Sequence, residues 1–218
     1  MEFMYKIIKK QICIVALILC ATFSTNTLAD AGQQTAEQIY NKINQNDSIS
    51  ANYAKLAPWL KSPDHDQKNI ARSNETSALK SLLESKANSG DVNAIFYFAM
   101  LIKTEAISKQ VDGEKYQSST LIEESKNEYD LAMSLFKKAG AAGISAASWN
   151  VAVMYANGYG TTTSKLAAIE WFYKAGIEFL KSGHREQALA ALEAIQAINK
   201  DSDLGKRLER QLNKGAPK

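Results

Sequence analysis

One internal repeat constrains the possible fold of this chain more than any other feature. Residues 130–140 align with residues 166–176 at an offset of 36. In both copies, apolar residues recur at positions i, i+3, i+4 and i+7, which is one face of an α-helix. A repeated amphipathic helix cannot bury its apolar face alone, so the pattern predicts helices stacked on one another. The matched residues include Ala132 with Ala168, Phe136 with Phe172, and Ala139 with Ala175.

A second alignment extends the repeat to the preceding helices. Residues 90–102 match residues 143–155 at an offset of 53, and 53 − 36 = 17. The first copy therefore carries about 17 extra residues between its two helices, within the polar stretch 103–124. The same offset of 53 places Leu79 and Leu83 on Ala132 and Phe136, which predicts a degenerate partner helix over residues 75–87.

These alignments predict an all-α chain, built as an α-solenoid of stacked antiparallel helix pairs. The stretch Asn157-Gly158-Tyr159-Gly160 is typical of a helix stop followed by a tight turn, since glycine can leave a helix through positive φ. Ser164 is a plausible N-cap for the next helix. The predicted helices, with ends good to about 2–4 residues, are 33–45, 49–60, 74–88, 91–107, 126–141, 144–156, 164–182, 184–199 and 202–213.

Residues 150–176 resemble one unit of the Sel-one-like repeat family, a relative of the tetratricopeptide repeat. The resemblance rests on the spacing of Tyr155, of Gly158 and Gly160, of Trp171-Phe172 and of Lys174-Ala175-Gly176. The upstream copy is weaker and lacks the Gly-x-Gly turn. In all, the resemblance covers about residues 75–198, and it implies a superhelical stack that binds other proteins.

The repeat positions divide into small and large residues. The small ones let neighbouring helices approach closely, and they are Ala132, Ala139, Ala152, Ala168 and Ala175. The large ones are expected to fill the gaps between repeats, and they are Phe136, Tyr155, Trp171 and Phe172.

The N-terminus has the layout of a secretory signal peptide. Lysines at positions 6, 9 and 10 precede an apolar run over residues 12–23, and a small-residue site ends at Ala29. The run is about 12 residues long, too short to span a bilayer comfortably. We therefore expect export to the periplasm or beyond the cell, and no integral membrane span after cleavage. An uncleaved anchor and a lipoprotein signal at Cys20 are the alternatives.

The predicted domains follow from these features: a signal peptide at 1–29, a helical and loop segment at 30–70, the repeat domain at 71–200, and a capping helix with a tail at 201–218. Removing the signal takes away three lysines and Glu2, so the net charge falls from +3 to +1. This balance does not support a nucleic-acid partner. Cys13 and Cys20 both lie in the signal, so the exported form would have no disulfide.

Residues with catalytic or metal-binding chemistry are sparse. The Asp64-His65-Asp66 triplet lacks further ligands at suitable spacing, so a solvated turn is the simpler interpretation. No Gly-x-Ser-x-Gly motif is present, and the Gly158-Tyr159-Gly160 segment lacks the lysine of a phosphate-binding loop. We expect no catalytic residue, no metal and no cofactor. A small exported hydrolase built on a repeat fold is the alternative function.

The first helices of tetratricopeptide-like pairs line a concave surface. This places a candidate binding groove at Phe96, Met100, Lys103, Trp149 and Val153. The alternative is that Phe96 and Trp149 form core between repeats. For the last helix, with Leu204, Leu208 and Leu212 on one face, an end cap is preferred to a membrane-surface helix.

The expected function is therefore an exported protein–protein interaction module that holds a peptide or helix of a partner. The resemblance implies a role in envelope or secretion complexes, in contact with host proteins, or as an immunity partner. The insertion over residues 103–124 is expected to lengthen both flanking helices, with a mobile tip at Asp112-Gly113, or else to lie against the stack.

Overall fold

The computed structural model describes residues 36–41 and 70–214. These residues form α-helices and short loops, and no strand occurs among them. The chain divides into two compact units, Met1–Leu82 and Leu83–Lys218. The first unit contains helix α2 (Ala36–Asn41) and the start of α4 (Ile70–Asn88). The predicted signal peptide and the helix expected at 49–60 lie outside the described residues.

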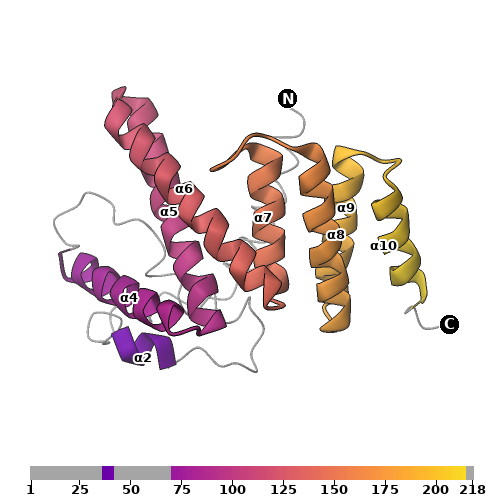
Figure 1. Ribbon diagram of the computed structural model, residues 1–218, viewed down its shortest axis with the longest axis horizontal. Helices are drawn as coiled ribbons and strands as arrows, with labels where there is room; N and C mark the ends of the chain where they lie inside the picture. Colours follow the sequence, from indigo (N-terminus) through magenta and orange to yellow (C-terminus); the bar gives the residue numbers. More distant parts are fainter. Residues whose placement is uncertain (1–35, 42–69, 215–218) are drawn as a thin grey trace, which may run out of the picture. The chain divides into compact units, whose positions relative to one another are not determined.

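After α4, the second unit continues as a series of helices that pack on their neighbours in sequence. They are α5 (Val92–Tyr116), α6 (Ser119–Ala141), α7 (Ser145–Asn157), α8 (Lys165–Lys181), α9 (Arg185–Ile198) and α10 (Asp203–Lys214). Each of α5 to α9 packs on the next, and α10 packs on both α8 and α9 (Figure 1). The all-helical prediction is confirmed for the described residues, and the packed adjacent pairs are compatible with an α-solenoid.

Matched positions of the two copies have matched burial. On α6 and α8, Ala132, Ala139, Ala168 and Ala175 are all 0 % exposed. On α5 and α7, the pairs Ala94 with Ala147 and Ala99 with Ala152 are likewise fully buried. For α6 and α8 this confirms the buried face that the repeated apolar stripe predicted. Of the large residues, Phe136 and Phe172 are buried, whereas Tyr155 and Trp171 keep partial exposure.

The turn between α7 and α8 has the backbone that its glycines predict. Gly158 ends α7 at φ 77°, and Gly160 follows at φ 60°. The Ser164 hydroxyl then accepts a hydrogen bond from the Ala167 amide and caps α8. Gly160 also meets a second constraint, because a Cβ at this position would lie 2.6 Å from the carbonyl carbon of Tyr129 on α6. The rings of Tyr129 and Tyr159 stack here, with centroids 5.1 Å apart.

The insertion over residues 103–124 lengthens both helices of the α5–α6 hairpin, as predicted. The predicted position of its turn is wrong. The chain turns at Gln117 and Ser118, not at Asp112-Gly113. The amides of Gln117 and Ser118 both donate to the Gly113 carbonyl, so Gly113 accepts the bonds that close α5. A Cβ at Gly113 would lie 2.8 Å from the Ile122 side chain. This glycine therefore serves the close approach of two helices rather than a turn.

The last helix covers the end of the second unit. Leu208 and Leu212 of α10 are 0 % and 1 % exposed and join the core formed by α7, α8 and α9. Gly176 makes this packing possible, since a Cβ there would lie 2.5 Å from Leu208. The apolar face of α10 is thus used inside the protein, as the end-cap interpretation requires. Among the helices of the described ranges, none is both long and apolar enough to cross a membrane.

Candidate functional site

Lys103 joins α5 and α7, which are the first helices of the two repeat copies, and its ammonium is largely desolvated. The Lys103 ammonium donates to the Asn150 side-chain oxygen at 2.6 Å and lies 5.7 Å from the centre of the Phe136 ring. Part of the side chain reaches the surface, yet burial of the charged end lowers the pKa of Lys103 to about 8. Among the described residues, no carboxylate forms an ion pair with it.

The residues of the predicted groove divide between core and surface. Phe96 is 3 % exposed and packs on Phe136 at 6.0 Å, so it belongs to the core, as the alternative interpretation held. Trp149 packs edge-on against Phe172 at 4.9 Å but remains partly exposed. Met100 and Val153 are also partly exposed. The hydrogen bond between Lys103 and Asn150 brings the two helices of this set together.

We call the partly exposed members of this set the Lys103 surface. Its members are Met100, Lys103, Trp149, Asn150 and Val153. It combines one desolvated cation, one amide and three largely apolar side chains. Asn150 was not predicted, although its place directly after Trp149 on the first helix of the repeat could have suggested it.

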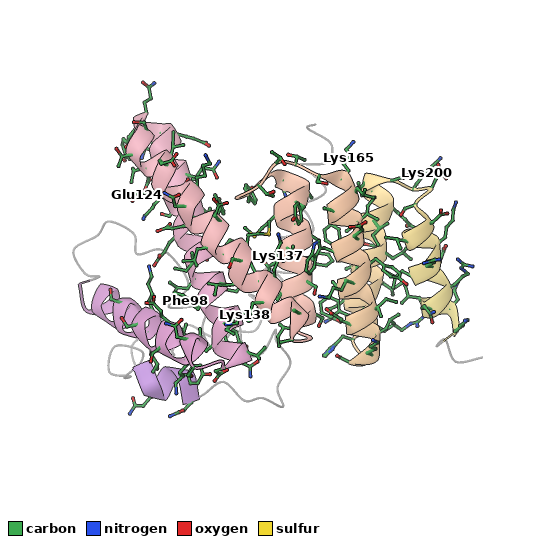
Figure 2. The ribbon with its side chains drawn as sticks, in the orientation of Figure 1. Phe98, Glu124, Lys137, Lys138, Lys165 and Lys200 are labelled. Carbon is green, nitrogen blue, oxygen red and sulfur yellow. The ribbon has the colours of Figure 1, made fainter. Side chains whose placement is uncertain are left out.

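A second group of charged residues holds the α5–α6 hairpin together. The Lys109 ammonium contacts Glu128 at 2.6 Å and Glu124 at 2.9 Å. These contacts, led by the hydrogen bond to Glu128, raise the pKa of Lys109. Glu124 lies on α6 towards the free end of the hairpin (Figure 2). In contrast to Lys103, Lys109 is paired with carboxylates, and these ion pairs fix one helix on the other.

One group of side chains has the residue types of a hydrolytic site, but a substrate cannot reach it. The Ser148 hydroxyl donates to the Glu178 carboxylate at 2.8 Å, and Glu178 lies 3.8 Å from Lys174. Ser148 is 0 % exposed, and the Lys174 ammonium donates to the Gly140 carbonyl at 2.9 Å. A substrate cannot reach a serine in this position without opening the α7–α8 packing. The group therefore ties α6, α7 and α8 together.

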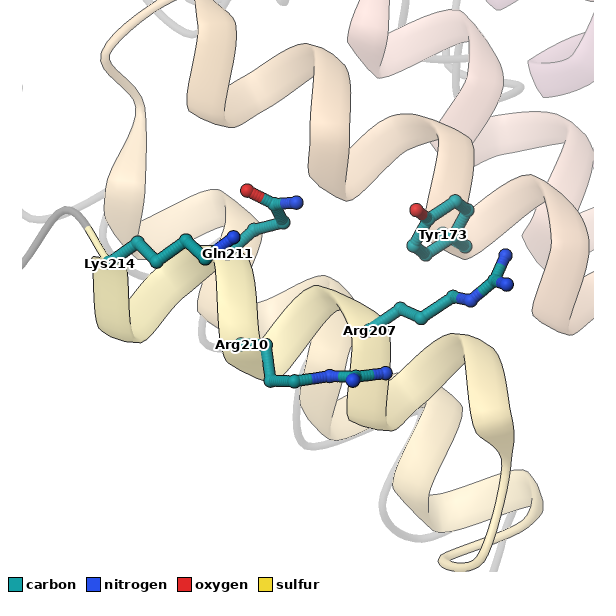
Figure 3. A pocket seen from close by; sticks show the side chains of 5 residues that line it. All are labelled: Tyr173, Arg207, Arg210, Gln211 and Lys214. Carbon is teal, nitrogen blue, oxygen red and sulfur yellow. The ribbon is translucent and has the colours of Figure 1, made fainter.

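An open hollow lies between α8 and α10. Its volume is about 340 Å³. Gln211 and Arg207 extend from α10 on the side that faces Tyr173 of α8 (Figure 3). None of the five residues that line the hollow was among the predicted site residues. The signal that would have found the hollow is the spacing of Arg207, Arg210 and Lys214, which repeats at i, i+3 and i+7 along one face.

Neither histidine adds to a metal site within the described residues. His65 and its flanking aspartates lie outside them. His184 precedes α9, and its ring packs edge-on against Phe179 at 6.4 Å. In the part of the chain that the structure describes, no three His, Cys, Asp or Glu side chains gather as metal ligands would.

Comparison of the chain with protein-family models, with curated proteins and with solved structures found no match.

Proposed function

We propose that this protein is a binding module for a segment of another protein, and that the Lys103 surface receives an acidic group of that segment. The observation that carries the proposal is the contact of the Lys103 ammonium with Asn150 and the Phe136 ring, without an ion pair to any carboxylate of the described residues. Charges removed from water are normally paired, because burying one alone is costly. Lys103 has one neutral hydrogen-bond partner and an aromatic face. A carboxylate supplied by a partner would complete this environment.

The side chains around Lys103 favour a peptide over a small ion. Met100, Trp149 and Val153 lie on the same two helices as Lys103 and Asn150 and are partly exposed, so these helices offer apolar contact as well as one polar anchor. Peptide-binding surfaces combine such apolar anchors with a few polar groups that fix orientation. An extended segment or a helix with an Asp, a Glu or a terminal carboxylate fits this chemistry.

The family and the location belong to the same proposal. The spacing of residues 150–176 supports membership of the Sel-one-like repeat family, and the lysine-led apolar run before Ala29 supports export. A scaffold of envelope or secretion complexes, a contact with host proteins and an immunity role are all compatible with an exported module of this kind.

The test is crosslinking capture with the full chain expressed from its own N-terminus. The captured partner is identified by mass spectrometry, and N-terminal sequencing of the bait is expected to read Asp30. Lys103→Met is expected to abolish capture, whereas Lys165→Met, at the exposed start of α8, retains it (Figure 2). Retention of Met1 on soluble protein would contradict export, and capture by Lys103→Met at the wild-type level would contradict the assigned surface.

The pH dependence of binding gives an independent readout. With a pKa of about 8, Lys103 is mostly charged at pH 7 and mostly neutral at pH 9. If only the charged form binds the acidic group, the affinity of the wild-type protein falls about tenfold between these pH values. Lys103→Met should show no such fall. A wild-type affinity that is constant over this range would overturn the role of the ammonium.

A further inference from the structure

The hollow between α8 and α10 concentrates positive charge without neutralising it. Arg207, Arg210 and Lys214 line it. None of the three forms an ion pair among the residues that the structure describes. Within the described part of the chain, the one side-chain hydrogen bond of these cations runs from Arg210 Nε to the Lys206 carbonyl of the same helix, at 3.2 Å. Elsewhere in the same unit, Lys109 shows the opposite arrangement, with two carboxylates within 3 Å.

The remaining groups of the hollow are neutral hydrogen-bonding side chains. Tyr173 contributes a hydroxyl from α8, and Gln211 contributes an amide from α10 (Figure 3). The guanidinium of arginine presents several N–H donors in a planar fork that matches the oxygens of a phosphate. Two such forks, one ammonium and two neutral side chains therefore suit a ligand with several anionic oxygens.

We propose that this hollow binds a phosphate monoester or diphosphate group carried by a small molecule or a lipid. Three unpaired positive charges match a group of more than one negative charge, and a phosphate monoester carries about −1.5 to −2 near neutral pH. A single carboxylate would leave much of the charge uncompensated. The volume of about 340 Å³ lies at the lower end of the range usual for ligand pockets, so it leaves room for part of the group that bears the phosphate.

The packing of α10 excludes its insertion into a lipid bilayer as an amphipathic helix. An amphipathic helix that lies in a bilayer inserts its apolar face among the lipid chains. Leu208 and Leu212 of α10 are instead buried in the protein core. A lipid would therefore be held by its phosphate headgroup alone, with the helix remaining in the stack. This site lies on helices other than those of the Lys103 surface, so each proposal stands or falls separately.

The test uses calorimetric titration with inorganic pyrophosphate, with sodium chloride at equal ionic strength as the reference. The variant Arg207→Gln/Arg210→Gln removes two charges from the hollow. The matched control, Lys200→Gln/Lys206→Gln, removes two exposed charges from the same end of the chain that do not line it. We expect the first variant to weaken pyrophosphate binding about tenfold or more and the control by about twofold or less.

Vesicles distinguish the two sources of phosphate. Co-sedimentation with phosphatidylcholine vesicles that contain phosphatidic acid, competed by pyrophosphate, assigns the site to a lipid headgroup. Pyrophosphate binding without co-sedimentation assigns it to a soluble phosphate compound. Either result supports the proposal. It is overturned if pyrophosphate has no effect beyond that of chloride, if both variant pairs weaken binding equally, or if a polyglutamate peptide binds the hollow more tightly than pyrophosphate.

Discussion

The α5–α6 hairpin and the α7–α8 pair bury the same positions but end differently. Both pairs place alanines at the helix contacts, and Phe136 and Phe172 occupy equivalent buried positions. The α7–α8 pair closes through two glycines, whereas α5 and α6 continue for several turns and meet at Gln117. Figure 1 shows the hairpin projecting past the end of α7. The part of each pair that packs on neighbouring helices is therefore determined by stacking. The part that extends past the stack can differ in length from one pair to the other.

Two contacts join the α5–α6 hairpin to the α7–α8 pair. The turn lies on α6 at Tyr129, and Lys103 reaches Asn150 of α7. Several large apolar side chains beyond the Tyr129 contact are exposed, with Val111 at 56 % and Tyr116 at 61 %. The comparison therefore separates a stacked part of the hairpin from an extension, and each of the following predictions tests one part of it.

The largest effect is expected at the turn. Gly160→Ala forces a Cβ against the Tyr129 backbone at a φ of 60°, so the backbone must move. We expect the free energy of unfolding to fall by about 3 kcal/mol or more, measured in urea. Gly143→Ala is the matched control, because its φ is 95° but nothing lies within 4 Å of the added Cβ. It should cost only about 1–2 kcal/mol. Equal losses would mean that the turn does not press on α6.

At the contact between Lys103 and Asn150, we expect an intermediate effect of opposite sign, in which the variant has a higher free energy of unfolding than the wild type. The pKa of Lys103 is about 8 in the folded protein and 10.5 in the unfolded chain. Between these values the unfolded chain binds more protons, so stability rises with pH. Below pH 8 the burial penalty is present in full, and Lys103→Met should be more stable than wild type by about 1–3 kcal/mol. This gain should shrink as the pH is raised from 7 to 9.5. A difference that does not change with pH would indicate a fully solvated ammonium.

The smallest effect is expected at the extension. Replacing residues 112–123 by a short Gly/Ser loop keeps Lys109, Glu124 and Glu128 and removes mainly exposed side chains. Thermal and urea unfolding should change by less than about 1 kcal/mol. Loss of cooperative unfolding would show that the extension is part of the core. Unchanged stability with lost partner capture would move the partner contact from the Lys103 surface to the extension.

Much of the fold and part of the site followed from local sequence. The repeated spacing of alanines and aromatics predicted the buried faces of α6 and α8, and Gly158 and Ser164 marked one helix end and one helix start. These features could be predicted because helical periodicity and capping act within a few residues of the chain. The candidate groove was predicted by the same logic, since residues three and four apart share a face, and it stays a prediction, with Phe96 placed in the core instead.

Features that depend on residues far apart in sequence could not be predicted and became visible only in the packed helices. Gly113 was compatible with a turn or with a close helix contact, and only the position of Ile122 selects the second. Phe96 and Trp149 align at one repeat position, yet Phe96 is buried by Phe136 while Trp149 stays partly exposed. Periodicity along the chain is enough to show which faces are apolar, because it is a local pattern. Which neighbour covers each face, and which charges remain unpaired, depended on how the helices stack.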